Sequence, residues 1–499
     1  MSSVAPSLIH LAADAAMDGS SPSATEMPML DKHQPHTLRR SLRIVTMAWG
    51  FGAVWMYATT GAARTQFAKS MGMSDAAFGL MSAIPNLGLL LQVIASYLIE
   101  RYGNRKKLFL IAGTIHRLLW ILIAAIPWLP IPMSEHWWVF LAFLALTTAI
   151  ANMNDPAWLI WMADLVPDTI RGRYFGRRGQ LGRMVGIATT ISIGFILDQA
   201  KAVDQQTLQR TISVLFIIAS MFGAVDILMF KWVPDEYRKP VEQKPPFFTM
   251  LAQPLKHPAF RRFLAFRATL FFAIGYIEYY AWLYLFDVVE MSNWRANVML
   301  VAVPTIVTMC TFPLWGRLVD RLGCRPVLLI AGVMITHGAL SWMFVTKDNW
   351  WFGYFAVLSA TMAWPGVELA SQNILLDMAD SDTNVQGGSA YIAVHSAVIG
   401  VAGICSGLFA SLVVEQLHDW HAVILGWPVT YHGLLFFISA VLRLTSLIWL
   451  IGMPEPESYT TPAAFRYIVG NIYANVNTVL VNGWRGFGRM KKILRSSRR

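Results

Sequence analysis

Long apolar segments with few or no charged residues recur along this sequence of 499 residues. An apolar run of about 18 residues or more is long enough to cross the hydrocarbon of a bilayer as a helix. Only 14% of the residues are charged and 56% are hydrophobic, so the chain lacks the polar side chains that a soluble protein of this size needs on its surface. The sequence therefore predicts a multi-pass membrane protein.

The apolar segments number twelve, and their spacing predicts the organisation of the chain. They lie near residues 41–64, 75–99, 107–129, 137–163, 179–198, 209–232, 261–286, 294–319, 327–346, 350–377, 388–416 and 428–452. The longest interval between them is rich in proline and charge and separates two sets of six. We expect a disordered cytoplasmic tail (1–38), an N-terminal six-helix bundle (39–232), a cytoplasmic central loop (233–260), a C-terminal six-helix bundle (261–452) and a cytoplasmic C-terminal tail (453–499).

The positions of the basic residues test this topology. If both termini are cytoplasmic, most of the 40 Lys and Arg residues fall on the cytoplasmic side. The opposite side receives only Arg64, Lys69, Lys201, Arg210, Arg295 and Lys347. The positive-inside rule requires this bias, which an odd number of helices would scramble. The same rule accounts for the net charge of +11 without a nucleic-acid partner, and we expect a protein of the cytoplasmic (inner or plasma) membrane.

The two tails carry weaker signals. Between Ile468 and Ile493, apolar residues recur at helical spacing, with Arg and Lys near the end. This pattern predicts an amphipathic basic helix on the anionic inner leaflet or, as an equal alternative, one packed against the protein itself. The N-terminal tail lacks an apolar core after a basic start, so we expect no cleaved signal peptide. The three cysteines lack ligand spacing, and we expect neither a metal nor another cofactor.

One phrase occurs twice in the sequence. Residues 100–113 read ERYGNRKKLFLIAG, and residues 320–332 read DRLGCRPVLLIAG. Each copy falls in a short cytoplasmic loop between the second and third helices of its half. An acid ends one helix, a glycine allows a tight reversal, and basic residues open the next helix. Equivalent copies in two halves indicate duplication of a six-helix unit, as in many secondary transporters.

At these loops the sequence resembles the major facilitator superfamily. The second copy closely follows that family's motif G-x-L-x-D-R-x-G-R-[RK], through Gly316, Asp320, Arg321, Gly323 and Arg325. The first copy is looser, with Ser96 in the Gly position and Glu100 in the Asp position, although Arg101, Gly103, Arg105 and Lys106 fit. The stretch 163–178 also resembles the family's pattern between helices 4 and 5.

The resemblance covers about residues 40–452 and implies a fold of two pseudo-symmetric six-helix bundles, with the repeated loops acting in gating. It also implies transport by alternating access. The drug–proton antiporter branches carry an Arg in helix 4 and the pattern G-x-x-x-G-P-x-x-G-G in helix 5. This sequence has neither feature, which argues against a typical drug antiporter.

Charged residues deep within the predicted helices are costly and need a reason. The acids Asp155, Glu278 and Glu368 lie deep in helices 4, 7 and 10, which line the central cavity in the family. We expect one or more of them to carry coupling protons or to bind a cationic part of the substrate, with structural pairing between helices as the alternative. Further candidates for polar contacts with the substrate are Asn152, Tyr280 and Gln372.

Basic and acidic residues elsewhere in the helices favour structural roles. Arg117 and Arg443 fall in the peripheral helices 3 and 12, where we expect structural pairing with an acid. Asp226, Arg183 and Arg267 lie nearer the cytoplasmic ends, where a side chain can extend to the membrane surface.

Together these features predict a secondary active transporter for a small polar or organic solute, and we expect it to be monomeric and coupled to protons. No nucleotide-binding loop G-x-x-x-x-G-K-[ST] occurs, so ATP does not drive transport from this chain. The alternatives are a facilitator without ion coupling, or a membrane enzyme or receptor that reuses the bundle. An enzyme is not favoured, because no cluster of catalytic side chains is evident.

Overall fold

The computed structural model describes residues 35–102, 105–235, 252–381, 389–424 and 427–453. Each of the twelve apolar segments predicted from the sequence coincides with helical structure in these ranges. Nine of the helices in this part of the chain are long and apolar enough to cross a membrane. The protein is therefore an all-α membrane protein, as predicted. The predicted N-terminal tail, most of the central loop and the C-terminal amphipathic helix lie outside the described residues.

The N-terminal half begins with α2 (Pro35–Ala58), which the short helix α3 (Gly61–Ser70) follows directly. The long helices after them are α4 (Asp75–Tyr102), α5 (Arg105–Ala125), α6 (His136–Leu165), α7 (Asp168–Val203) and α8 (Gln205–Met229). Short 3-10 turns occur at η1 (Ile126–Trp128), η2 (Met133–Glu135) and η3 (Phe230–Trp232).

The C-terminal half has more interruptions. Its α-helices are α10 (Pro258–Gly275), α11 (Tyr280–Leu283), α12 (Asn293–Asn297), α13 (Val303–Leu322), α14 (Cys324–Ser341), α15 (Phe352–Ser381), α16 (Ser389–Leu417) and α17 (Tyr431–Ser446). The π-helices η5 (Tyr284–Val288) and η6 (Val298–Ala302) extend α11 and join α12 to α13. Three 3-10 turns are η4 (Pro254–Lys256), η7 (Trp342–Phe344) and η8 (Leu447–Leu450). An antiparallel hairpin of β1 (His421–Ile424) and β2 (Trp427–Thr430) joins α16 to α17, and the sequence did not predict it.

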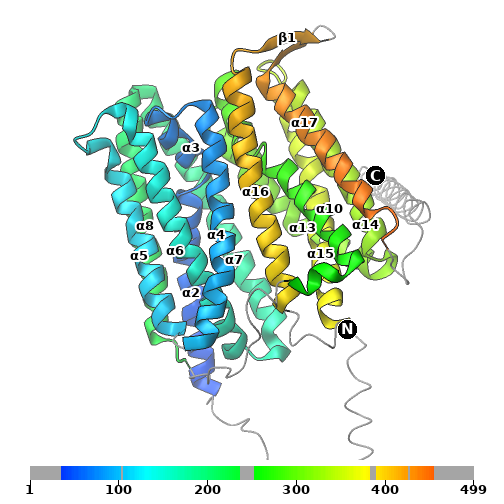
Figure 1. Cartoon of the computed structure of the whole chain (residues 1–499). Coiled ribbons are helices and arrows are strands. Elements are labelled where there is room, and N and C mark those ends of the chain that lie inside the picture. The colour runs from blue at the N-terminus through cyan, green and yellow to red at the C-terminus, as the bar shows by residue number, and fades with distance from the viewer. Residues whose placement is uncertain (1–34, 103–104, 236–251, 382–388, 425–426, 454–499) are drawn as a thin grey trace, which may run out of the picture.

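The two halves stand side by side, with blue-to-teal helices in one bundle and green-to-orange helices in the other (Figure 1). The most extensive contacts between them are those of α4 with α16 and of α7 with α12. At the first of these contacts a Cβ on Gly79 would lie 2.6 Å from the carbonyl oxygen of Gly407. Small residues therefore let the halves approach closely along α4 and α16.

The helices that begin each half are both broken. In the first, the hydroxyls of Thr59 and Thr60 donate to the carbonyls of Trp55 and Met56, and Gly61 has a positive φ of 62°. In the second, residues 276–279 form a tight turn between α10 and α11. A helix tends to end where side-chain hydroxyls donate hydrogen bonds to carbonyls of the preceding turn, and where a residue adopts the left-handed backbone conformation. The apolar pattern of the sequence predicts one continuous helix in each case, and the structure shows a break in both.

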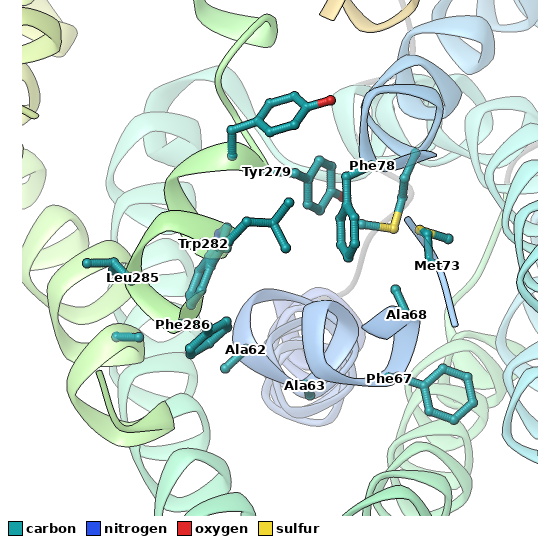
Figure 2. Close-up of a cluster of buried hydrophobic side chains, with 14 of the residues drawn as sticks. Ala62, Ala63, Phe67, Ala68, Met73, Phe78, Tyr279, Trp282, Leu285 and Phe286 are labelled. Carbon is teal, nitrogen blue, oxygen red and sulfur yellow. The ribbon is translucent and has the colours of Figure 1, made fainter. Parts of the chain in front are cut away.

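The end of the molecule that the charge bias assigns to the outside is closed by contacts between the halves. The carboxylate of Asp198 on α7 accepts hydrogen bonds from the backbone N–H groups of Asn293 (2.7 Å) and Trp294 (3.0 Å) at the start of α12. Apolar side chains of α3 and α4 face those of α11 and η5 beside this contact (Figure 2). Asp198 thus supplies an N-terminal cap to a helix of the other half.

The opposite end of α7 has fewer close neighbours among the described residues. A Cβ added to Gly172, Gly176 or Gly179 in the first turns of α7, or to Gly316 of α13, would meet no described atom within 4 Å. At the other end of α7, in contrast, a Cβ on Gly194 would lie 2.4 Å from Trp294. The described contacts between α7 and the C-terminal half therefore concentrate at the end that the charge bias assigns to the outside.

Candidate functional site

Four charged side chains line a cleft in the N-terminal half. Its volume is about 380 Å³, and its walls come from α2, α5, α6, α7, α8 and η3. The lining residues are Trp49, Phe109, Arg117, Asn154, Asp155, Trp158, Leu159, Arg178, Asp226, Ile227 and Phe230. Because α5 packs against both α6 and α8, and α8 packs against α2, these helices form one continuous wall around the cleft.

A buried ion pair lies within this wall. Arg117 on α5 donates through Nη2 to Asp226 Oδ2 on α8 at 3.1 Å, and its guanidinium carbon lies 3.5 Å from the ring centre of Trp55. Two glycines permit the close approach, since a Cβ on Gly52 would lie 2.5 Å from Asp226 and one on Gly223 would lie 2.6 Å from Arg117. The predicted pairing of Arg117 with an acid is confirmed. The expectation that Asp226 extends to the membrane surface is wrong, because the side chain is buried against Arg117.

A second guanidinium is held by two indole rings. Arg178 on α7 lies with its guanidinium carbon 4.5 Å from the ring centre of Trp49 and 4.7 Å from that of Trp158. Contacts of this kind fix a cation by its attraction to the ring faces. Among the described residues, none accepts a hydrogen bond from this guanidinium or forms an ion pair with it.

Asp155 lines the same cleft from α6 and is exposed there. Arg117 is close enough for their charges to interact, but the described residues form no ion pair with Asp155. Four buried polar atoms of the lining have no hydrogen-bond partner among the described residues: Trp49 Nε1, Arg117 Nε, Asn154 Oδ1 and Arg178 Nε. A native interior rarely leaves such groups unpaired, so their concentration in one cleft indicates a site for a polar ligand.

The corresponding region of the C-terminal half holds a different cluster. Arg267 on α10 lies with Nε 3.4 Å from His395 Nε2 on α16 and donates through Nη1 to the hydroxyl of Ser371 on α15, also at 3.4 Å. Glu368, one turn before Ser371, is close enough for its charge to act on Arg267. Both Glu368 and Arg267 are half-buried. The structure therefore places Arg267 within a polar cluster, which the sequence interpretation of this residue did not foresee.

Glu278 lies in the turn that breaks helix 7 and is exposed there. Its neighbour Tyr279 is buried and accepts a hydrogen bond from Arg64 Nη1 of α3 through its hydroxyl at 3.2 Å. Arg64 also donates through Nε to the carbonyl of Thr59, at the break between α2 and α3. The charge of Arg64 acts on Glu278, so the two helix breaks face each other across the halves. In transporters, interrupted helices of this kind often mark the route of the substrate.

The three candidate acids thus share one arrangement. Asp155, Glu278 and Glu368 each lie near an arginine of another helix whose hydrogen bonds go to other groups. An acid in this position interacts electrostatically with a positive charge without forming an ion pair. Such an acid can change its protonation without breaking a helix contact.

The other predicted substrate contacts differ in exposure. Asn152 donates through Nδ2 to the carbonyl of Thr148 and packs against Gly88 of α4, so it joins two helices rather than lining the cleft. Tyr280 is 1% exposed within the main hydrophobic core. Gln372 on α15 is exposed, next to Ser371. Of these three, only Gln372 is fully exposed, and Asn152 is half-buried.

Arg443 on α17 is buried and donates through Nη1 to the carbonyl of Ile335 at 3.1 Å. In the part of the chain that the structure describes, no acid pairs with it, and its Nε has no partner. The prediction that Arg443 pairs with an acid is therefore wrong for the described residues. A backbone carbonyl replaces the acid, because its dipole also attracts a cation.

The repeated loop motif is partly described. Arg105 is 4% exposed and pairs with Asp164 and Asp235, so it joins the starts and ends of three helices at the predicted cytoplasmic surface. In the second copy, Asp320 and Arg321 are exposed at the end of α13, and Gly323 turns the chain with a φ of 87° before Arg325 enters α14. The side chains of Glu100 and Arg101, and all of Gly103, lie outside the described residues.

Sequence reasoning missed Arg178, Trp49 and Trp158. It assigned Arg178 to a cytoplasmic loop, whereas α7 begins at Asp168 and places this arginine within the helix. Pro167 followed by Asp168 is a helix-start signal that could have moved the boundary. The sequence offers no comparable signal for the two tryptophans, because only the packing of α2, α6 and α7 brings their rings to Arg178.

Comparisons with known proteins add a family and a fold. A sequence model described as Major Facilitator Superfamily matches residues 46–391. No curated protein sequence matches the chain. Among solved structures, the D-xylose-proton symporter is similar with a TM-score of 0.60 at 14% identity, covering 85% of this chain and 99% of its own. The nucleoside transporter NupG has a TM-score of 0.57 at 13% sequence identity, and the match covers 84% of this chain and 98% of NupG. The E. coli fucose:proton symporter FucP has a TM-score of 0.52 at 12% identity, and the match covers 84% of this chain and 100% of FucP.

Proposed function

Because the chain belongs to the major facilitator superfamily, we propose that it is a secondary active transporter that moves a small polar or organic solute by alternating access and couples this movement to protons. The family and the solved relatives point to a transporter rather than an enzyme. Two of those relatives are proton symporters by name, and at this identity they support the fold alone.

The observation that carries the proposal is the charged cleft in a molecule whose two halves meet at one end of α7. Asp198 joins the halves there by accepting hydrogen bonds from the start of α12, and the described residues show no comparable contact at the other end of α7. Arg117, Arg178 and Asp155 lie in the cleft between these ends of the helices. Alternating access requires such a site, together with a contact between the halves that can open.

Proton coupling is proposed for Asp155, Glu278 and Glu368. Each has an arginine of another helix nearby, and none forms an ion pair within the described residues. Protonation of such an acid changes the balance of charge between helices and can bias one conformation over the other. Gln372 is proposed as a further polar contact of the substrate because it is exposed beside this cluster.

The topology forms part of the same proposal. We place both termini and the central loop (233–260) in the cytoplasm, with bundles at 39–232 and 261–452 and the repeated loops at the cytoplasmic gate. Arg105 supports this role for the first copy, because it joins several helix ends through Asp164 and Asp235. The monomer, the cytoplasmic membrane and the contact of the C-terminal tail with anionic lipid are proposed on the sequence pattern alone.

Reconstitution in liposomes with an imposed pH gradient tests this function. We expect a solute from a panel of sugars, nucleosides and organic acids to accumulate when the gradient is present. Replacement of Asp155, Glu278 or Glu368 by its amide should abolish accumulation for at least one of them, while exchange of solute between the two sides continues. Full proton-driven accumulation in all three variants would contradict the assignment of the coupling residues.

The second candidate function is facilitated diffusion without coupling. It shares the fold and the cleft, so the gradient separates the two functions. Equilibration of the solute without accumulation, in the wild-type protein, would favour the facilitator.

A further inference from the structure

The cleft of the N-terminal half is rich in unpaired hydrogen-bond donors. Trp49 Nε1, Arg117 Nε and Arg178 Nε can only donate, and only Asn154 Oδ1 among the unpaired atoms accepts. A buried donor without a partner is destabilising, so a ligand that brings hydrogen-bond acceptors into the cleft gains affinity by pairing with these donors. This excess of donors favours a ligand with acceptor oxygens.

The two arginines of the cleft differ in how their charge is balanced. Arg117 donates to Asp226 at 3.1 Å, and that carboxylate is itself buried. Arg178 lies over the faces of Trp49 and Trp158, Tyr174 of the same helix is near it, and Asp226 acts on it without forming an ion pair in the described residues. Arg178 is therefore a fixed guanidinium available to an anion. A planar guanidinium matches a carboxylate through two parallel hydrogen bonds.

From this we infer that the transported solute is a small organic anion whose carboxylate binds Arg178 in the cleft and whose apolar part lies against the aromatic lining. The inference rests on the proposed transport function and names its substrate class. The cleft volume of about 380 Å³ is at the lower end for small-molecule sites, which suits a solute with a single ring or a short chain.

The charges of the cleft also determine whether a proton is taken up together with the anion. With both acids ionised, Arg117 and Arg178 are balanced by Asp155 and Asp226, and a bound monoanion would add an uncompensated negative charge. Asp226 is held by Arg117, whereas Asp155 has no ion-pair partner in the described residues. Asp155 is thus the acid that takes up a proton when the anion binds.

The groups facing Asp155 come from several helices. Arg117 faces it from α5, and the cleft adds Arg178 from α7 and Asp226 from α8. The described side chains of α4, which also packs on α6, include one titratable group, Asp75, at the outer end of that helix. Proton uptake at Asp155 therefore depends on the two arginines, on Asp226 and on the anion itself.

A binding experiment on the purified full-length protein tests the substrate class. The probes are matched sets: benzoate with benzamide and benzylamine, nicotinate with nicotinamide, and gluconate with glucose. We expect at least one carboxylate to raise the melting temperature, more strongly at acidic than at mildly alkaline pH, while its neutral or cationic partner does not. Equal shifts for the neutral or cationic partners, or no shift with any carboxylate, would overturn the inference.

Variants on α7 locate the site. R178Q should weaken binding of the active carboxylate about ten-fold or more, since it removes a charge-assisted contact. R177Q is the matched control, because Arg177 is the exposed neighbour on the same helix and does not line the cleft. Both variants must keep the melting temperature of the unliganded protein. Equal affinities in R178Q and R177Q would remove Arg178 from the site.

D155N separates binding from coupling. In proteoliposomes we expect this variant to exchange the carboxylate across the membrane and to bind it with little dependence on pH, but not to accumulate it in a pH gradient. Gradient-driven accumulation by D155N would refute the role of Asp155. If wild-type protein moves only neutral solutes, the inference about the anion fails and the transport function stands; if it moves no solute of the panel, the transport function itself fails.

Discussion

The two halves share a helix plan but differ in how they hold buried arginine. In the N-terminal half, Arg117 reaches across to Asp226, and Arg178 lies between two indoles beside it. In the C-terminal half, Arg443 meets only the carbonyl of Ile335, and Arg267 has weak contacts with Ser371 and His395. The two halves therefore share a helix plan and differ in their polar interior.

This difference separates two roles. A buried arginine with an acid partner is costly to disturb, because removing either group leaves the other charged and buried. A buried arginine on a carbonyl leaves no such charge behind. We therefore expect the N-terminal cleft to be sensitive to single substitutions and the α14–α17 contact to be tolerant of them.

The largest effect should come from breaking the N-terminal pair. Arg117→Met leaves the carboxylate of Asp226 buried without its partner, and we expect a loss of about 3–5 kcal/mol in stability. Denaturant titration of the protein in mild detergent measures this loss. The double variant Arg117→Met with Asp226→Leu should recover most of it; if the single and double variants are equally unstable, the pair does not account for the loss.

A smaller effect is expected where the halves meet. Asp198→Ala removes the carboxylate that caps α12, and the loss of such a cap costs about 0.5–2 kcal/mol. Because the cap joins the halves in this state, its loss should let the variant populate the outward-open state several-fold more. Distances between spin labels on α7 and α12 measure the population of this state. Asp198→Asn is the control, because its amide oxygen can still accept a hydrogen bond from α12. An unchanged distance distribution in Asp198→Ala would show that the cap does not hold the gate.

The loop motif should affect rate rather than stability. Asp320 is exposed at the end of α13, so Asp320→Asn costs little folding energy. We expect slower transport with normal insertion in the membrane, measured as initial uptake against the amount of protein in the membrane. Wild-type rates would reduce the second copy of the motif to a signal for topology.

The smallest effect is expected at the C-terminal arginine. Arg443→Met removes a buried guanidinium that has no acid partner in the described chain, and a hydrophobic side chain of similar length can take its place. The change in stability should lie within about 1 kcal/mol, in either direction. A loss as large as that of Arg117→Met would show that the two halves hold arginine equally tightly.

The fold was largely predictable and the site was only partly so. The twelve apolar segments and the loop around Asp320 were sufficient for the fold, because hydrophobic thickness and charge bias act locally along the chain. Asp155 was identified as a candidate because its helix position was right. Arg178 was missed because one misplaced helix start assigned it to a loop, and Asp226 was misread because its partner lies more than a hundred residues away in the sequence.

The sequence by itself determined that this chain crosses a membrane many times, in two related halves, with acids deep in the fourth, seventh and tenth apolar segments. These properties follow from the cost of placing charge and unpaired backbone in lipid, which each segment satisfies on its own. Only the tertiary structure decided which charges meet. The pairing of Arg117 with Asp226, the clamping of Arg178 by Trp49 and Trp158, and the capping of α12 by Asp198 all depend on how separate helices pack, which no local pattern contains.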